Sequence, residues 1–126
     1  MTELERSLRQ VALDLETLDR RFAVVGGLAV SIRAEPRLTR DVDVEVLPGL
    51  VLPVATIGHL IVMKLLARDD RRRPNDADDL RALAIEATPA DWEQALQAAQ
   101  LVHERGFGRE RDLVELVDEL RRDGVW

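Results

Sequence analysis

Apolar residues recur along the chain with two different periods, which separates the segments expected to be helical from those expected to be strands. Residues 4–22 carry an apolar stripe spaced by three or four residues, typical of an amphipathic helix; its members are Leu4, Leu8, Val11, Leu15 and Leu18. Residues 41–46, DVDVEV, alternate strictly between an acid and a valine. This second pattern predicts a strand with one apolar and one acidic face.

Shorter elements are expected around this strand. The valine-rich run FAVVGG (residues 22–27) predicts a buried strand that ends at a diglycine, and residues 27–34 predict a short helix that stops before Pro36. Residues 47–50, LPGL, predict a turn. The VLPV that follows predicts an edge strand, because proline cannot donate to a central ladder.

The second half of the chain is expected to be helical. Candidate N-caps precede three helical segments, and a glycine suited to a left-handed conformation follows the third; these residues are Thr56, Asn75, Thr88 with Pro89, and Gly106. The last helix would turn four apolar residues inward, Leu113, Leu116, Val117 and Leu120. We therefore predict a single α+β domain over residues 1–126, with a small mixed sheet within 1–55 and helices within 56–126.

Composition indicates an ordinary globular protein. The chain has 126 residues, enough for one core, of which 46% are hydrophobic and 33% charged. No apolar run is long enough to cross a bilayer, and the charged N-terminal residues are unlike a signal peptide. The absence of cysteine excludes disulfides and thiolate metal sites. We expect a cytoplasmic protein that makes no membrane contact.

The net charge of −6 argues against nonspecific binding to duplex nucleic acid, which depends on cations that neutralise phosphates. One local exception is the basic run Arg71, Arg72 and Arg73. This run could still dock a structured RNA.

Candidate chemistry concentrates in VVGGLAVSIRAEPRLTRDVDVEV, residues 24–46. Asp41 and Asp43 lie two residues apart on one strand, so both carboxylates leave the same face, where they could bind Mg²⁺. The diglycine, Gly26 and Gly27, lets the backbone approach a ligand closely, and the helix after it presents N–H groups to an anion. A half-exposed strand and a glycine turn taken singly would explain each feature as structural. Together they predict a pocket for a magnesium–triphosphate.

The same segment closely resembles the signature of nucleotidyltransferases in the DNA polymerase beta-like superfamily. It is most similar to the AbiEii/AbiGii-type toxins, in which Gly-Gly followed by R-x-T-x-D-x-D marks the active site. The resemblance implies that Gly26 and Gly27 bind nucleotide phosphates and that Asp41 and Asp43 bind Mg²⁺. Arg37 and Thr39 match the positions before the two aspartates, where they could contact phosphates.

A second block, HLIVMKLLARDDRRRPNDADDLRAL (residues 59–83), resembles the later helical motif of that family. The resemblance implies that Lys64, the only lysine, reaches the nucleotide, and that Asp76 pairs with it or orients it, with Asp79 as the partner of Asp76. Helix capping would explain the two aspartates equally well without the lysine motif. An exposed helix cation would be the structural explanation of Lys64, and a half-buried position at a helix start is the preferred explanation of His59.

The chain departs from the family pattern in one respect. Family members place several dozen residues, with further strands and another carboxylate, between the two blocks, whereas only EVLPGLVL stands here. Three functions stay open, of which a plain helical interaction domain with coincidental motifs is the least favoured, because two blocks match in order. One is Mg²⁺-dependent transfer of NMP from an NTP to a hydroxyl of RNA (tRNA) or protein, as in a toxin paired with an antitoxin. The alternative is a catalytically impaired nucleotide-binding or regulatory module, whose shortened sheet a homodimer could cover.

Overall fold

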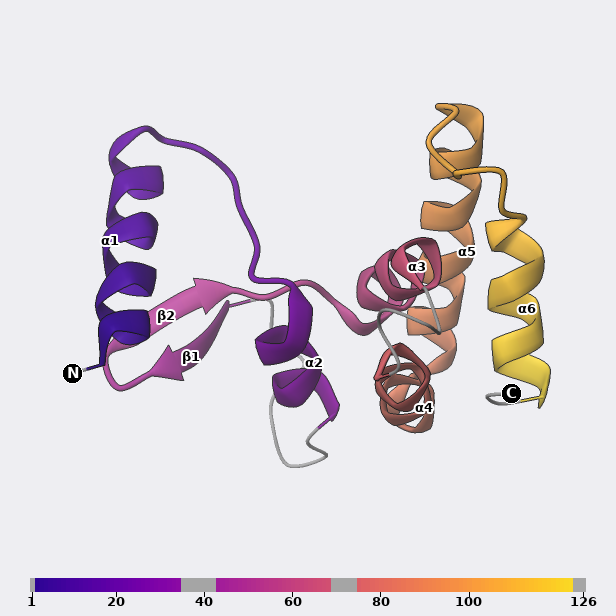
Figure 1. The fold of residues 1–126 in the computed structure, drawn as a ribbon, viewed down its shortest axis with the longest axis horizontal. Helices are drawn as coiled ribbons and strands as arrows, with labels where there is room; N and C mark the ends of the chain where they lie inside the picture. The colour runs from indigo at the N-terminus through magenta and orange to yellow at the C-terminus, as the bar shows by residue number, and fades with distance from the viewer. Residues whose placement is uncertain (1, 35–42, 69–74, 124–126) are drawn as a thin grey trace.

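The computed structural model describes residues 2–34, 43–68 and 75–123. Helices and strands together confirm the predicted α+β class (Figure 1). The described elements, in chain order, are α1 (Glu3–Thr17), α2 (Gly26–Ala34), β1 (Asp43–Leu47), β2 (Leu50–Pro53), α3 (Ile57–Ala67), α4 (Asp76–Glu86), α5 (Pro89–Glu104) and α6 (Leu113–Asp123). No helix within these three ranges is long and apolar enough to span a bilayer.

The sheet is small because its strands are short. β1 and β2 form an antiparallel hairpin with a bulge between Glu45 and Leu47, and the predicted turn at residues 48–49 is confirmed, with Gly49 at φ +75°. The run FAVVGG adds a single parallel bridge, Val24 to Val54, rather than the predicted buried strand. The parallel pairing ends at this bridge because both chain segments soon become helical: α2 begins at Gly26, and α3 begins at Ile57.

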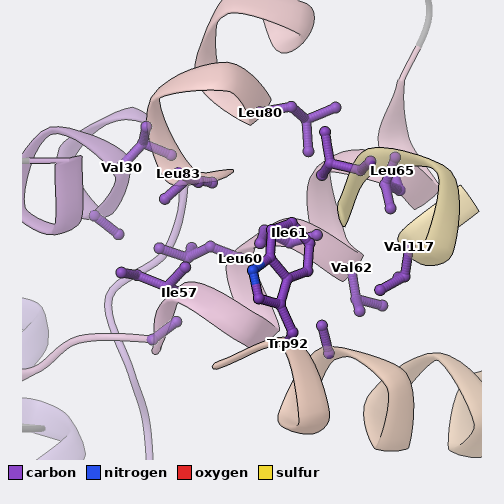
Figure 2. Packing of buried hydrophobic residues seen from close by; sticks show 14 of the residues in the cluster. Val30, Ile57, Leu60, Ile61, Val62, Leu65, Leu80, Leu83, Trp92 and Val117 are labelled. Atoms are coloured by element: carbon purple, nitrogen blue, oxygen red, sulfur yellow. The ribbon is translucent and has the colours of Figure 1, made fainter. Parts of the chain in front are cut away.

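Most of the hydrophobic core lies between the helices of the second half. Figure 2 shows α3 at its centre, where Leu60, Ile61 and Leu65 are enclosed by side chains of α4, α5 and α6. Trp92 of α5 packs into the same cluster. The predicted inward face of the last helix is confirmed, since Leu113, Val117 and Leu120 are buried and Leu116 packs against the cluster.

The helix ends follow the sequence signals closely. Thr56 caps α3, and Thr88 forms a full capping box with Asp91, in which the Thr88 N–H donates to Asp91 Oδ2 at 2.8 Å and the Asp91 N–H donates to Thr88 Oγ1 at 3.2 Å. Gly106 adopts φ +76° beyond the end of α5, as predicted. Asn75 holds the N-cap position of α4 but makes no side-chain capping bond.

Helix α1 is formed where the apolar stripe predicts it, yet it adds little to the core. Figure 1 shows α1 beside the β1–β2 hairpin, at the end of the molecule opposite α5 and α6. Ala12 is its one buried residue in the described chain, while Leu4, Val11 and Leu18 are exposed. Arg9 Nη2 donates to the Pro48 carbonyl at 2.8 Å and holds the helix to the hairpin turn.

Candidate functional site

Lys64 lies at the centre of a buried ion cluster between α3 and α4. Its ammonium Nζ is 3.2 Å from Asp76 Oδ1 and 2.8 Å from Asp79 Oδ2, and the whole residue is only 8% exposed. The two aspartates are three residues apart in the first turn of α4, so both side chains lie on one face of that helix. The expected pairing of Lys64 with Asp76 is thus present, Asp79 also pairs directly with Lys64, and an exposed-cation explanation of Lys64 is wrong.

The two aspartates stabilise the charged form of Lys64. Burial disfavours the charged ammonium, but the hydrogen bonds that it donates to Asp79 and Asp76, together with the negative charges of these carboxylates, outweigh burial and raise the pKa of Lys64. Lys64 is therefore a cation throughout the physiological pH range. An ammonium has three N–H donors, and among the described residues two of them serve the aspartates, so the third is available to a ligand.

A pocket of about 220 Å³ brings the two sequence blocks together. It is lined by Val25, Gly26, Leu60, Met63, Lys64 and Ala67. Gly26 comes from the diglycine at the start of α2, whereas Lys64 comes from the last turn of α3. Gly26 has φ +78° with no atom within 4 Å of where a Cβ would stand, so its backbone is open on this side. The pocket combines an accessible helix start, apolar walls and a fixed cation.

Asp43 is the first residue of β1 and lies at the same end of the sheet as the diglycine. It stands opposite Pro53 in the hairpin, and the Pro53 carbonyl accepts from the Val24 N–H at 2.7 Å. Asp43 and Val24 are thus separated by one strand, roughly 10 Å across the sheet. The predicted alternation of β1 is confirmed, since Asp43 and Glu45 are exposed and Val44 is buried.

Glu45 shares the exposed face of Asp43 but serves the hairpin turn. Its Oε1 accepts from the Gly49 N–H at 2.8 Å. This contact gives Glu45 a structural role, and it leaves Asp43 as the carboxylate of β1 best suited to a metal. Carboxylate oxygens are the hard ligands that Mg²⁺ prefers, so the side chain of Asp43 has the chemistry needed to bind this ion.

Several predicted site residues lie outside the described residues; they are Arg37, Thr39, Asp41, Arg71, Arg72 and Arg73. Gly27 is the second residue of α2. Within the part of the chain that is described, no three His, Asp or Glu side chains are grouped to hold a metal. His59 is exposed in the first turn of α3, so the expectation that it is half-buried is wrong.

Two arginines that the sequence did not single out hold the pocket elements in place. Arg33 is buried at the end of α2, where Nε and Nη2 donate to the carbonyls of Ala55 and Val54 at 3.1 and 2.9 Å. Arg111 donates to the carbonyls of Leu65 and Arg68, both at 2.7 Å, and caps the end of α3. In the sequence both look like surface cations, and only the tertiary fold shows which carbonyls they meet.

Comparison of the chain with models of protein families gives no match, and a search of curated proteins gives none either. The resemblance to nucleotidyltransferases therefore depends on the two motif blocks. In the structure, Gly26 of the first block and Lys64 of the second line one pocket, and the ion cluster is formed by residues of the second block.

Proposed function

We propose that this chain is a magnesium-dependent nucleotidyltransferase of the AbiEii/AbiGii toxin type, which transfers NMP from an NTP to a hydroxyl of RNA, such as tRNA, or of a protein. The observation that carries the proposal is that Gly26 of the first motif block and Lys64 of the second line the same pocket. If the two segments matched the family motifs by chance, the resemblance would give no reason for them to line the same pocket.

Each residue of the two blocks has a distinct role under this proposal. Backbone N–H groups at Gly26 and Gly27, at the start of α2, would bind phosphate oxygens. Arg37 and Thr39 would add contacts to the same phosphates. Lys64 would donate its remaining N–H to the nucleotide, while Asp76, a positioning residue with Asp79, fixes the ammonium.

Magnesium would be held by Asp41 and Asp43, and when bound it would neutralise charge on the phosphates. The chain itself would orient the triphosphate against the acceptor hydroxyl. The volume of about 220 Å³ is below the range of roughly 300–1,000 Å³ typical of sites for drug-sized ligands. The pocket would therefore take the part of the nucleotide nearest Lys64.

The alternative, a nucleotide-binding module with impaired catalysis, is favoured by one specific observation. β2, the strand next to β1, has the sequence LVLP and carries no carboxylate. A site that depends on Asp41 and Asp43 alone would bind magnesium–nucleotide yet activate an attacking hydroxyl poorly. Binding without transfer is the result expected of this alternative.

A label-transfer assay tests the enzymatic proposal. The protein is incubated with Mg²⁺, each α-labelled NTP in turn, and either tRNA or cell protein as acceptor. We expect label to enter an acceptor, and Asp43→Asn to reduce the rate by about 100-fold or more, the usual effect of losing one electrostatic group in the site. Glu45→Gln is the matched control, because Glu45 is on the same strand but is bound to the turn.

The outcomes separate the two candidate functions. Transfer that is lost with Asp43→Asn and kept with Glu45→Gln supports the enzyme. Mg²⁺-dependent nucleotide binding without transfer supports the impaired module. If neither transfer nor nucleotide binding occurs, both are wrong. For the toxin role, expression should slow bacterial growth, and Asp43→Asn should relieve the effect, as would co-expression of an antitoxin.

A further inference from the structure

The α5–α6 loop, residues 105–112, presents an aromatic ring to solvent where α5 ends and the chain turns into α6 (Figure 1). Phe107 in this loop is 69% exposed, whereas Trp92 of α5 is buried. Phe107 stands between two glycines, and no atom lies within 4 Å of where a Cβ at Gly106 would stand. The neighbouring residues therefore add no side chain that would shield the ring.

The backbone fixes the position of Phe107. α5 ends in a Schellman motif, in which the Phe107 N–H donates to the Val102 carbonyl at 3.1 Å and the Gly106 N–H donates to the His103 carbonyl at 3.0 Å. A hydrophobic contact often accompanies this motif, but the exposure of Phe107 shows that most of its ring is not covered by one. The ring is thus presented to solvent on an ordered backbone.

Two arginines flank Phe107 and are free to bind a ligand. Arg105 and Arg109 are exposed, and neither side chain makes a hydrogen bond or ion pair with another described residue. The third arginine of the loop, Arg111, donates instead to two carbonyls at the end of α3, the helix that carries Lys64. One arginine therefore anchors the loop, and two remain for phosphate oxygens, which the guanidinium group binds well.

Acids balance the arginines in this segment. Residues 104–112 hold three arginines and three acids, so their formal charge is zero. Glu104 Oε1 accepts from Gln100 Nε2 at 3.2 Å, Asp112 Oδ1 accepts from an N–H in the first turn of α6 at 3.1 Å, and Glu110 is exposed. A neutral segment gives no long-range attraction to nucleic acid, so binding here would depend on close contacts.

A hollow of about 610 Å³ adjoins the loop. It is lined mainly by the loop and the first turn of α6, and its polar walls include His103 and Arg109. The volume is within the range of roughly 300–1,000 Å³ typical of small-molecule sites. Arg109 and Glu110, both in the lining, have φ values of 54° and 62°, which other residues than glycine rarely adopt. Backbone strain of this kind is found preferentially at functional sites.

We infer that the α5–α6 loop binds single-stranded RNA. One base stacks on Phe107, Arg105 and Arg109 donate to the phosphates that flank it, and the hollow takes the next base. Duplex RNA does not suit the loop, because its bases are already stacked on each other. The choice of RNA rests on the proposed function, in which the loop holds the acceptor strand, since stacking alone does not distinguish RNA from DNA.

Fluorescence anisotropy of a labelled single-stranded RNA of about eight nucleotides tests the inference. Phe107→Ala should raise the dissociation constant about 10-fold, the usual effect of losing one stacking ring. Phe107→Trp should bind at least as tightly as the parent, whereas Phe107→Leu should bind as weakly as Phe107→Ala. Ile85→Ala is the matched control, because Ile85 is an apolar side chain of α4 that is 80% exposed, and it should bind as the parent does.

The salt dependence of the same binding tests the two arginines. Arg105→Ala and Arg109→Ala should each reduce the slope of log affinity against log salt by about 0.7, the value for one phosphate contact on a single strand. Arg20→Ala is the matched control, because Arg20 is exposed beyond the end of α1, and it should leave the slope unchanged. Circular dichroism checks that all variants keep their helices.

The assay contains neither NTP nor Mg²⁺, so its failure and the failure of the proposed function are distinguishable. Single-stranded DNA of the same sequence should bind no more tightly than the RNA, and duplex RNA should compete poorly. The inference is overturned if the parent binds no RNA at protein concentrations up to about 1 mM, if duplex RNA competes as well as the single strand, or if DNA binds more tightly. It is also overturned if Phe107→Leu binds RNA as the parent does, the result expected of an apolar surface that docks a protein.

Discussion

Replacing Lys64 with methionine removes the cation of the buried cluster while keeping an unbranched side chain of similar length. In the parent, the ammonium lies within 3.2 Å of Asp76 and 2.8 Å of Asp79, with the Asp76 side chain 3% exposed. Methionine leaves two carboxylates close together at the start of α4 without the lysine charge. The variant should therefore be less stable although no apolar contact is lost.

The expected loss is about 3 kcal/mol. Removing one partner of a buried ion pair costs roughly 3–5 kcal/mol, and the lower end applies here because the Asp79 side chain retains some contact with water. A domain of this size is stable by only about 5–15 kcal/mol. The melting temperature should consequently fall by about 10 °C.

Urea unfolding followed by fluorescence and circular dichroism measures this loss, with the buried Trp92 as one reporter. Arg6→Met is the matched control, because Arg6 pairs with Glu3 on the exposed surface, and its loss should cost under about 1 kcal/mol. Adding Asp76→Asn and Asp79→Asn to Lys64→Met should recover more than half of the stability. A cost for Lys64→Met no larger than that of Arg6→Met would refute the view that this cluster joins α3 to α4.

Three further predictions concern stability. Gly58→Ala should destabilise by more than about 3 kcal/mol in urea, because its Cβ would stand 2.5 Å from the Asp91 carbonyl oxygen where α3 meets α5, and a cost below about 1 kcal/mol would contradict that close packing. Thr88→Ala should cost about 1 kcal/mol through loss of the capping box, whereas an unchanged unfolding midpoint would show that the box is not needed. Burial lowers the pKa of Lys64, but its hydrogen bonds to Asp79 and Asp76 and the charges of these carboxylates outweigh burial. The pKa of Lys64 in the folded protein is therefore raised above the ordinary lysine value of 10.5. The stabilisation that charged Lys64 gives the fold is thus fully present below pH 10.5 and is lost as pH rises through the raised pKa. The difference in unfolding free energy between the parent and Lys64→Met should therefore shrink only above pH 10.5. A difference that already shrinks at about pH 8 would be inconsistent with this prediction.

Local chemistry made the helices and the hairpin predictable. Thr88 with Pro89 and Asp91 carries its own start signal, and Gly106 its own stop signal, so these boundaries need no knowledge of the rest of the fold. The alternation of Asp43, Val44 and Glu45 likewise follows from the strand period.

Properties that depend on distant segments could not be read from the sequence. The run FAVVGG has the composition of a strand, but only Val54 is available to pair with it before the chain turns into α3. The α1 stripe gave the helix correctly but not what faces it, since an apolar face does not specify its partner.

The candidate site was predictable in part. Pairing of Lys64 with Asp76 was expected from the motif, and the structure shows that pair and a direct contact of Lys64 with Asp79 as well. The structural roles of Glu45 and Arg33 depend on the turn carbonyls and amides that the fold brings within reach. Such contacts have no periodic signal in the sequence.

Calorimetric titration with each NTP, in the presence and absence of Mg²⁺, measures whether the chain binds magnesium–nucleotide. We expect one site per chain that needs Mg²⁺, is weakened by Lys64→Met and disappears in the double variant Asp41→Asn/Asp43→Asn, while Glu45→Gln binds as the parent does. A parent that binds none of the four nucleotides, or a double variant that binds magnesium–nucleotide as tightly as the parent, would contradict it.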